Sequence, residues 1–287
     1  MTVNHSFVTA GAYALARRAV SHRTARLALA VPLLAGCVVS TQQEVQLGTQ
    51  YAQQINAQLP IVRDASANQY INSLGTSIAR IADTRNLQWR FFIVDSREVN
   101  AFAVPGGYVY VNRGLVERAS TMNQLAGVLG HEIAHVTQRH SVEQMAQAQR
   151  ADLGLTLACV LTSVCQSGAA STAIQVGGSA LFAKFSRDDE LKADEQAVSS
   201  LVRAGIDPRG IVDMFRTLLN ERRSRPTAVN AFFRTHPLEE DRIALAQGDI
   251  ARIPATRLRG LTVDTPSYQQ FRSRLAGVAT QASRPAR

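Results

Sequence analysis

The stretch that decides the fold is His131-Glu132-Ile133-Ala134-His135, an HExxH sequence inside an apolar pattern of helical period. Apolar residues recur through it at i, i+3 and i+4, at Leu125, Val128, Leu129, Ile133 and Val136. Thr121 followed by Gln124 predicts a capping-box start for this helix. On a helix the two histidines lie one turn apart on the same face, where they can hold one Zn²⁺. Glu132 lies beside them, in position to take a proton from water.

The same residues also fit an ordinary amphipathic helix whose histidines face solvent. A catalytic zinc needs a third protein ligand and one open position. Glu190 is the best candidate for that ligand, because Asp194 follows four residues later on the same helical face. Asp194 can then accept a hydrogen bond from a ligand histidine and fix its tautomer. The alternative is that this acidic cluster only stabilises a solvated helix N-terminus.

The composition excludes some classes of function. A chain of 287 residues with 46% hydrophobic residues fits one large domain or two small ones with a real core. The formal net charge is +9, yet only Lys184 and Lys192 are lysines, and the many arginines are scattered. No basic stripe interleaved with aromatic residues is present, so we do not expect a nucleic-acid partner.

The amino-terminal residues are typical of a targeting segment. Four arginines precede the short apolar run 27–35, which is too short to span a membrane as a mature helix. Leu34-Ala35-Gly36-Cys37 resembles a bacterial lipobox, in which the cysteine is lipidated and becomes the first residue. Val38 follows it, and the resemblance to lipoprotein sorting implies the periplasmic face of the outer membrane. A plain signal peptide, or a buried helix with an incidental cysteine, is the alternative.

Local patterns predict mainly helices. The expected helices cover 42–58, 66–81, 113–119, 121 onward, 187–203, 208–222 with Asp207 as cap, 238–247 and a short stretch 268–275. Residues 89–94 are a predicted strand, and 100–104 and 108–111 form a predicted hairpin around Pro105-Gly106-Gly107. The apolar segment 151–183 predicts a helical hairpin or a mobile flap, because its charge-free part is too short for a membrane span. Cys159 and Cys165 can form a disulfide only if the helix is interrupted between them.

Several motifs together carry a family resemblance. They are Asn100-Ala-Phe-Ala-Val-Pro-Gly-Gly107, Val128-Leu-Gly-His-Glu-Ile-Ala-His135, Ser186-Arg187 followed by Glu190 and Asp194, and Thr235-His-Pro237. In this order they resemble the gluzincin metallopeptidase family of HtpX and BepA, in its soluble periplasmic BepA-like branch. The matches span about residues 42–248. One departure is that no tetratricopeptide pattern follows His236, where the larger members carry one.

The resemblance implies a zincin-like α+β fold, mostly helical, with a small antiparallel sheet over the HExxH helix. It implies that His131, His135 and Glu190 bind one Zn²⁺ and that Asp194 supports them. Glu132 is then the general base, and Arg242 is the arginine of the last motif and a candidate donor to the oxyanion.

Two further histidines remain after removal of the leader. In the BepA-like branch the histidine matched by His236 lies at the active site and can reach the zinc, so His236 is expected to close the fourth position at rest. The alternative is a loop histidine that only caps the next helix. His140, five residues after His135, is expected to point away from the metal face and to be structural.

These expectations define a function and a domain plan. We expect a zinc endopeptidase that degrades unfolded or misassembled envelope proteins held extended along the 100–111 hairpin. The expected parts are a signal peptide 1–36, a lipidated tether 37–41, a peptidase domain 42–260 and a tail 261–287. The alternative function is a zinc-holding chaperone or outer-membrane assembly factor with latent protease activity. An integral enzyme is disfavoured, because no segment has the length of a membrane span.

Overall fold

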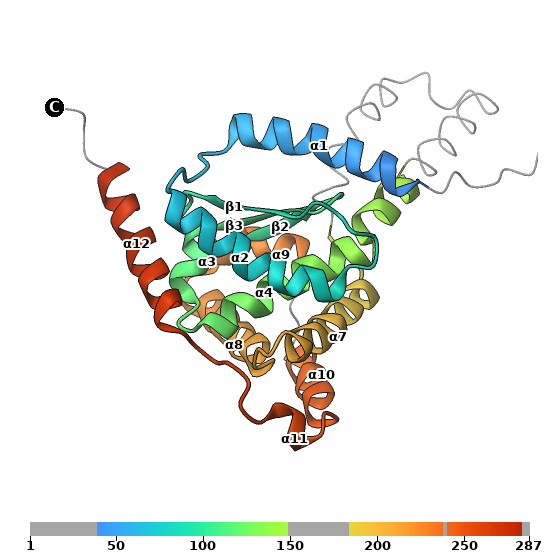
Figure 1. Ribbon diagram of the computed structural model, residues 1–287, viewed down its shortest axis with the longest axis vertical. Helices are drawn as coiled ribbons and strands as arrows, with labels where there is room; N and C mark the ends of the chain where they lie inside the picture. The colour runs from blue at the N-terminus through green and yellow to red at the C-terminus, as the bar shows by residue number, and fades with distance from the viewer. Residues whose placement is uncertain (1–38, 149–183, 238–239, 283–287) are drawn as a thin grey trace, which may run out of the picture. The chain divides into compact units, whose positions relative to one another are not determined.

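A computed structural model of the chain describes residues 39–148, 184–237 and 240–282 (Figure 1). Within these ranges the chain is mostly helical and contains one three-stranded sheet. The helices are α1 (Thr41–Gln58), α2 (Ala65–Ala82), α3 (Arg113–Arg118), α4 (Met122–Thr137), α7 (Arg187–Arg203), α8 (Arg209–Ser224), α9 (Pro226–Thr235), α10 (Glu240–Ala251), α11 (Ala255–Leu258) and α12 (Pro266–Ala282). The predicted α+β class is confirmed.

The sheet is mixed, and the prediction of an antiparallel sheet is wrong for one of its strands. Its strands are β1 (Arg90–Val94), β2 (Ala101–Val104) and β3 (Tyr108–Asn112), in the order β1-β3-β2. The predicted hairpin of β2 and β3 is confirmed, and Gly106 and Gly107 turn it with φ of 83° and 99°. Such values favour glycine. β1 pairs parallel with β3, which lies in the middle of the sheet.

The sheet lies between two layers of helix. α1 covers one face, and α2 and α4 lie on the other (Figure 1). Ala52 of α1 and Met145 of the helical segment 140–148 pack with buried β-strand residues such as Tyr110 on the first face. A larger apolar core joins the second face to α2, α4, α7 and α8. α4 therefore runs through the centre of the protein.

Small residues let neighbouring helices approach α4 closely. A Cβ atom on Gly127 would lie 2.9 Å from the side chain of Ile211 on α8, which is closer than real Cβ atoms come. A Cβ atom on Gly130 would lie 3.4 Å from Ala197 on α7. Gly127 is therefore needed for the close approach of α8, whereas the contact at Gly130 is an ordinary van der Waals distance.

The N-terminus of α4 is capped by a distant part of the chain. Thr121 is the N-cap residue, but its side chain makes no capping hydrogen bond, and Gln124 instead accepts one from the Ser120 amide. The amide of Met122 donates to Asp264 Oδ1 at 3.0 Å. The predicted capping box is therefore wrong, because tertiary contacts supply the acceptors that the first turn needs.

The other helices mostly follow the predictions. α7 covers the predicted range without a shift, and the predicted cap of α8 is confirmed, because Asp207 Oδ1 accepts a hydrogen bond from the Arg209 amide at 3.0 Å. Residues 226–235, expected as loop, form α9. The short pattern 268–275 belongs to the longer α12, whose Phe271 and Leu275 are buried in the core.

Some predictions fall outside the described residues. These are the lipidation of Cys37, the pairing of Cys159 with Cys165, and the hairpin or flap at 151–183. In the described part of the chain no helix has the length and apolarity needed to cross a membrane.

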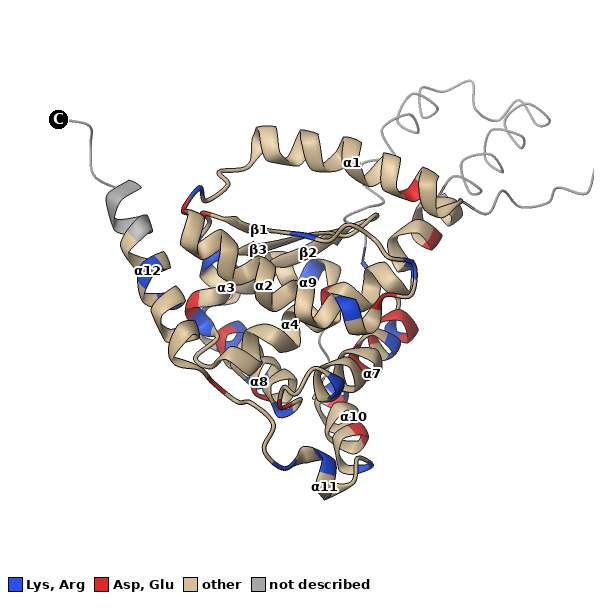
Figure 2. Cartoon of the chain, viewed as in Figure 1, with Lys and Arg blue, Asp and Glu red and all other residues tan. Residues whose placement is uncertain are grey.

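Acidic and basic residues lie side by side on α7 and α8 (Figure 2), in pairs such as Arg216 with Asp213.

Candidate metal centre

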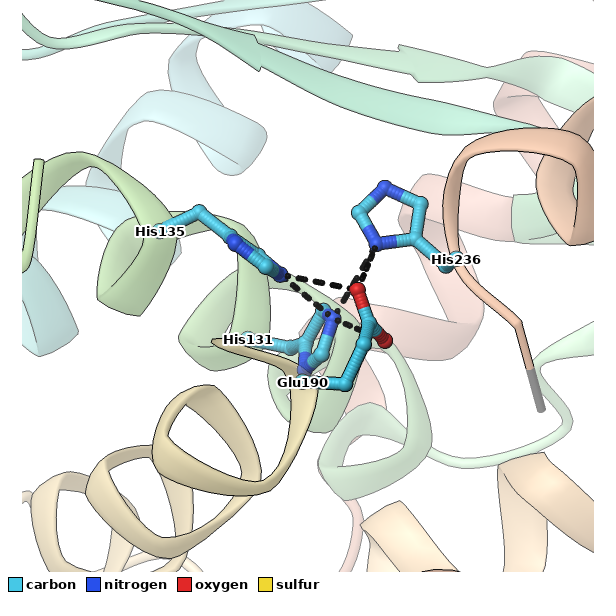
Figure 3. A group of neighbouring side chains, drawn as sticks. All are labelled: His131, His135, Glu190 and His236. Atoms are coloured by element: carbon cyan, nitrogen blue, oxygen red, sulfur yellow. Dashed lines mark hydrogen bonds and ion pairs between the residues drawn. The ribbon is translucent and has the colours of Figure 1, made fainter. Parts of the chain in front are cut away.

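α4 brings the three polar residues of HExxH into the core. Every residue of this helix from Met122 to Val136 except Gln124 is buried, because α2, α7, α8 and β2 surround it. The side chains of His131 and His135 point to one place from successive turns of the helix (Figure 3). The alternative of histidines facing solvent is wrong, since both are at most 2% exposed.

α7 supplies the predicted carboxylates. Its start is fixed by a capping box in which Ser186 Oγ accepts from the Asp189 amide and Asp189 Oδ2 accepts from the Ser186 amide. Glu190 in the first turn and Asp194 one turn later both face α4 and are buried. His131 Nδ1 donates to Asp194 Oδ1 at 2.8 Å, which leaves its Nε2 directed at Glu190. These carboxylates therefore belong to the site and are not a solvated cluster.

His236 lies at the C-terminal end of α9 rather than in a loop. It is the C-cap residue of that helix, is 1% exposed, and stacks on Phe232 one turn earlier. Its Nδ1 lies 3.1 Å from Glu190 Oε1 and 3.3 Å from His131 Nε2. The helix end thus holds the ring against the cluster (Figure 3).

The four side chains fit a zinc ion. The ligand atoms of His131, His135, Glu190 and His236 all lie within 4.8 Å of one another. Five of the six pairs, with either oxygen of Glu190, have separations of 3.0 to 3.5 Å. A tetrahedron with metal–ligand bonds of about 2.0–2.1 Å has edges of about 3.3 Å. His131 and His135 point Nε2 at each other across 3.0 Å, an arrangement that a cation between them stabilises.

The electrostatics of the cluster also favour a cation. Burial opposes charge on His131, but the carboxylates of Glu190 and Asp194 outweigh it and raise its pKa to about 10. At His135 burial dominates and holds the pKa well below its usual value. Burial alone would raise the pKa of Glu190, yet the neighbouring His236 and His131 lower it well below the usual range. The Glu190 carboxylate is thus favoured in its charged form, and a metal ion beside it would add a favourable positive charge.

The structure places Arg242 against the two carboxylates of α7. Its guanidinium is 2% exposed and donates to Asp194 through Nε at 2.9 Å and Nη2 at 2.8 Å. Nη1 donates to the Pro237 carbonyl at 2.8 Å and also to Glu190 Oε2. Because these donors point at the carboxylates from behind, Arg242 holds Glu190 and Asp194 in place. Its role as a donor to the oxyanion stays a prediction.

Two residues lie behind His135, on the side away from the cluster. His140, expected to point off the metal face, is not part of the cluster of ligand atoms, but it is buried and its Nδ1 lies 2.9 Å from His135 Nδ1, a contact that the sequence patterns did not predict. Burial lowers its pKa and favours the neutral ring. Phe185 stacks on the His135 ring with a centroid distance of 3.9 Å. The only signal for Phe185 is an aromatic residue directly before the α7 cap.

The fold and this cluster are those of a metallopeptidase, and comparison with known sequences agrees. Residues 65–249 match the model of peptidase family M48, so the chain belongs to this family. Enzymes of the family use zinc. The chain is 35% identical to the beta-barrel assembly-enhancing protease of Escherichia coli (strain K12) over 240 residues, which is 80% of the chain and 47% of that protein.

Other relatives show the same pattern. The putative beta-barrel assembly-enhancing protease of Vibrio cholerae is 32% identical over 78% of the chain and 48% of that protein. The metalloprotease YcaL of Escherichia coli (strain K12) is 31% identical over 50% of the chain and 56% of that protein. The chain thus spans about half the length of these curated relatives. The predicted BepA-like branch is confirmed.

Proposed function

We propose that the chain is a zinc-dependent endopeptidase that degrades unfolded or misassembled proteins of the bacterial envelope. The observation that carries the proposal is the buried convergence of His131, His135, Glu190 and His236 beside Glu132. The names of the beta-barrel assembly-enhancing relatives support an envelope role. Under this proposal the zinc ligands are His131, His135 and Glu190.

Glu132 is placed to act as the general base. It is 1% exposed, and in the described part of the chain its Oε1 accepts no hydrogen bond. His236 Nε2 lies 3.5 Å from Glu132 Oε1. When bound, zinc supplies a Lewis acid that polarises the scissile carbonyl and lowers the pKa of water. Glu132 then takes the proton of the attacking water and can pass it to the leaving amine.

The sheet offers a place for an extended substrate. The strand order leaves β2 at an edge of the sheet, and β2 packs against α4. A polypeptide that adds to this edge pairs backbone to backbone, so its sequence matters little but it must be unfolded there. This requirement supports unfolded or misassembled chains as substrates.

His236 makes the resting enzyme closed in this proposal. With its Nδ1 in the fourth ligand position, no place remains for the attacking water. Movement of α9 away from α4 would open that position.

Three other expectations complete the proposal: lipidation at Cys37, anchoring at the outer membrane, and a peptidase domain covering 42–260.

The test compares wild type with Glu132→Gln, using metal analysis and digestion of casein as an unfolded reporter. Both proteins should bind one zinc per chain, and Glu132→Gln should lose about 10²–10⁴-fold in rate, as expected for loss of a general base. Glu195→Gln makes the same chemical change at an exposed position of α7 and should cleave like wild type. Full activity in Glu132→Gln would refute the mechanism. Zinc binding without cleavage, even in His236→Ala, would favour the chaperone or assembly factor.

A further inference from the structure

The two histidines of the HExxH helix have different partners behind them. His131 Nδ1 donates to the carboxylate of Asp194. His135 Nδ1 instead lies 2.9 Å from Nδ1 of another histidine, His140, with the rings at 74° to each other. Both rings are buried, at 0% and 3% exposure. The nitrogen that orients His135 is therefore in contact with an imidazole and not with a carboxylate.

A sharp corner in the backbone brings His140 to this place. α4 ends at Thr137, and Arg139 adopts φ of 65°, in the left-handed region that side chains other than glycine rarely enter. Helix resumes at residue 140, in a new direction. The corner is held by an ion pair from Arg139 Nε to the fully buried Glu44 of α1 at 2.9 Å. A residue in this backbone conformation persists only where the surrounding structure holds it, so the position of His140 is a fixed feature of the fold.

The protons between the two rings can be assigned. If His135 offers Nε2 to a metal ion, its own proton lies on Nδ1 and is donated backward. His140 Nδ1 must then be the acceptor, so the proton of the neutral His140 ring lies on Nε2. That nitrogen faces Asp189 Oδ1 at 3.7 Å. Asp189 is itself held by Ser186, and the next residue is Glu190.

We propose that His140 is a positioning residue that holds His135 in the tautomer and orientation in which Nε2 faces the metal. The inference rests on the proposed zinc site and extends it, since a ligand histidine needs a fixed partner on its second nitrogen. The arrangement runs from the metal ligand His135 to His140, whose Nε2 faces Asp189 in the first turn of α7 at 3.7 Å, beyond hydrogen-bond distance.

The experiment measures zinc affinity by competition with a chromogenic chelator, in the full chain. His140→Leu removes the acceptor and keeps an apolar side chain of similar size, and it should weaken zinc binding by about 10–100-fold. His140→Asn is the matched variant, because its Oδ1 can occupy the place of Nδ1 and accept from His135. It should bind within about threefold of wild type. Equal affinities in wild type and His140→Leu would overturn the inference, and so would equal losses in both variants.

A second measurement uses the wild-type protein and does not depend on the folding of any variant. In the ¹⁵N spectrum of the zinc-loaded, histidine-labelled chain, His140 should have an unprotonated Nδ1 and a protonated Nε2. The opposite tautomer at His140 would overturn the inference. Failure of wild type to bind zinc would instead remove the proposed metal site, so the two failures are distinguishable.

Discussion

Arg242 offers the sharpest test of how the site is held together. The change Arg242→Met keeps the length of the side chain and removes every donor. In the structure it would leave Glu190 and Asp194 without the guanidinium that contacts both, and the side chains of all three are at most 3% exposed. The methionine can still pack on Phe215, over which the guanidinium lies at 5.0 Å. The change therefore removes the charge and the hydrogen bonds of the guanidinium and keeps most of the packing.

The magnitude follows from burial. Removing one partner of a buried ion pair costs about 3–5 kcal/mol of unfolding free energy, because the remaining charge is uncompensated. For a domain of this size each kcal/mol lowers Tm by about 2–4 °C, so metal-free Arg242→Met should melt about 6–20 °C below wild type. Zinc places a second positive charge beside Glu190 and should reduce this difference.

The assay is thermal and urea unfolding followed by far-UV circular dichroism, with chelator and then with zinc. Arg216→Met is the control, because Arg216 pairs with Asp213 on the surface of α8 and both side chains are about half exposed. Exposed pairs of this kind are worth at most about 1 kcal/mol. A loss below about 1 kcal/mol in metal-free Arg242→Met would refute the reasoning. It would mean that the two carboxylates do not need the arginine as their counter-charge.

Two further predictions concern the ends of α9 and α1. His236→Ala should keep one zinc per chain and cleave casein about tenfold faster or more, because a resting state closed by His236 leaves at most about 10% of molecules open; an unchanged rate would contradict the closed state. Glu44→Gln should lower the unfolding free energy by about 1–3 kcal/mol in urea, since Glu44 pairs with both Arg85 and Arg139. Gln53→Glu, on the exposed face of α1, is its control and should change stability by less than about 0.5 kcal/mol.

Local patterns predicted most of the helices because their signals are local. α7 begins at a capping box and presents an apolar face of period 3.6, so its range follows from nearby residues alone. The acceptors for the start of α4 come from Val263 and Asp264, more than 130 residues away. The parallel pairing of β1 with β3 is likewise a choice among distant partners. No short-range pattern contains that information.

The site divides in the same way. His131 and His135 could be predicted because both lie on one uninterrupted helix, where a spacing of four fixes their common face. Glu190 and Asp194 contact the histidines only because α7 packs on α4. Their roles were predicted by the family resemblance, since no local pattern predicts that packing. Arg242 was predicted to be at the site, but its contacts with Glu190 and Asp194 were not predicted. Which way a guanidinium points depends on the carboxylates that surround it.

His140 shows what a helical register leaves out. Counting five residues from His135 cannot predict the contact between the two rings, because one left-handed residue at Arg139 interrupts the helix between them. Neither glycine nor proline marks the corner in the sequence. The corner is stabilised by an ion pair with Glu44, 95 positions earlier, which no local sequence pattern predicts. The orientation of His140 therefore depends on how α1 packs. A substitution that loosens α1 should change the position of His140 and, through it, of His135.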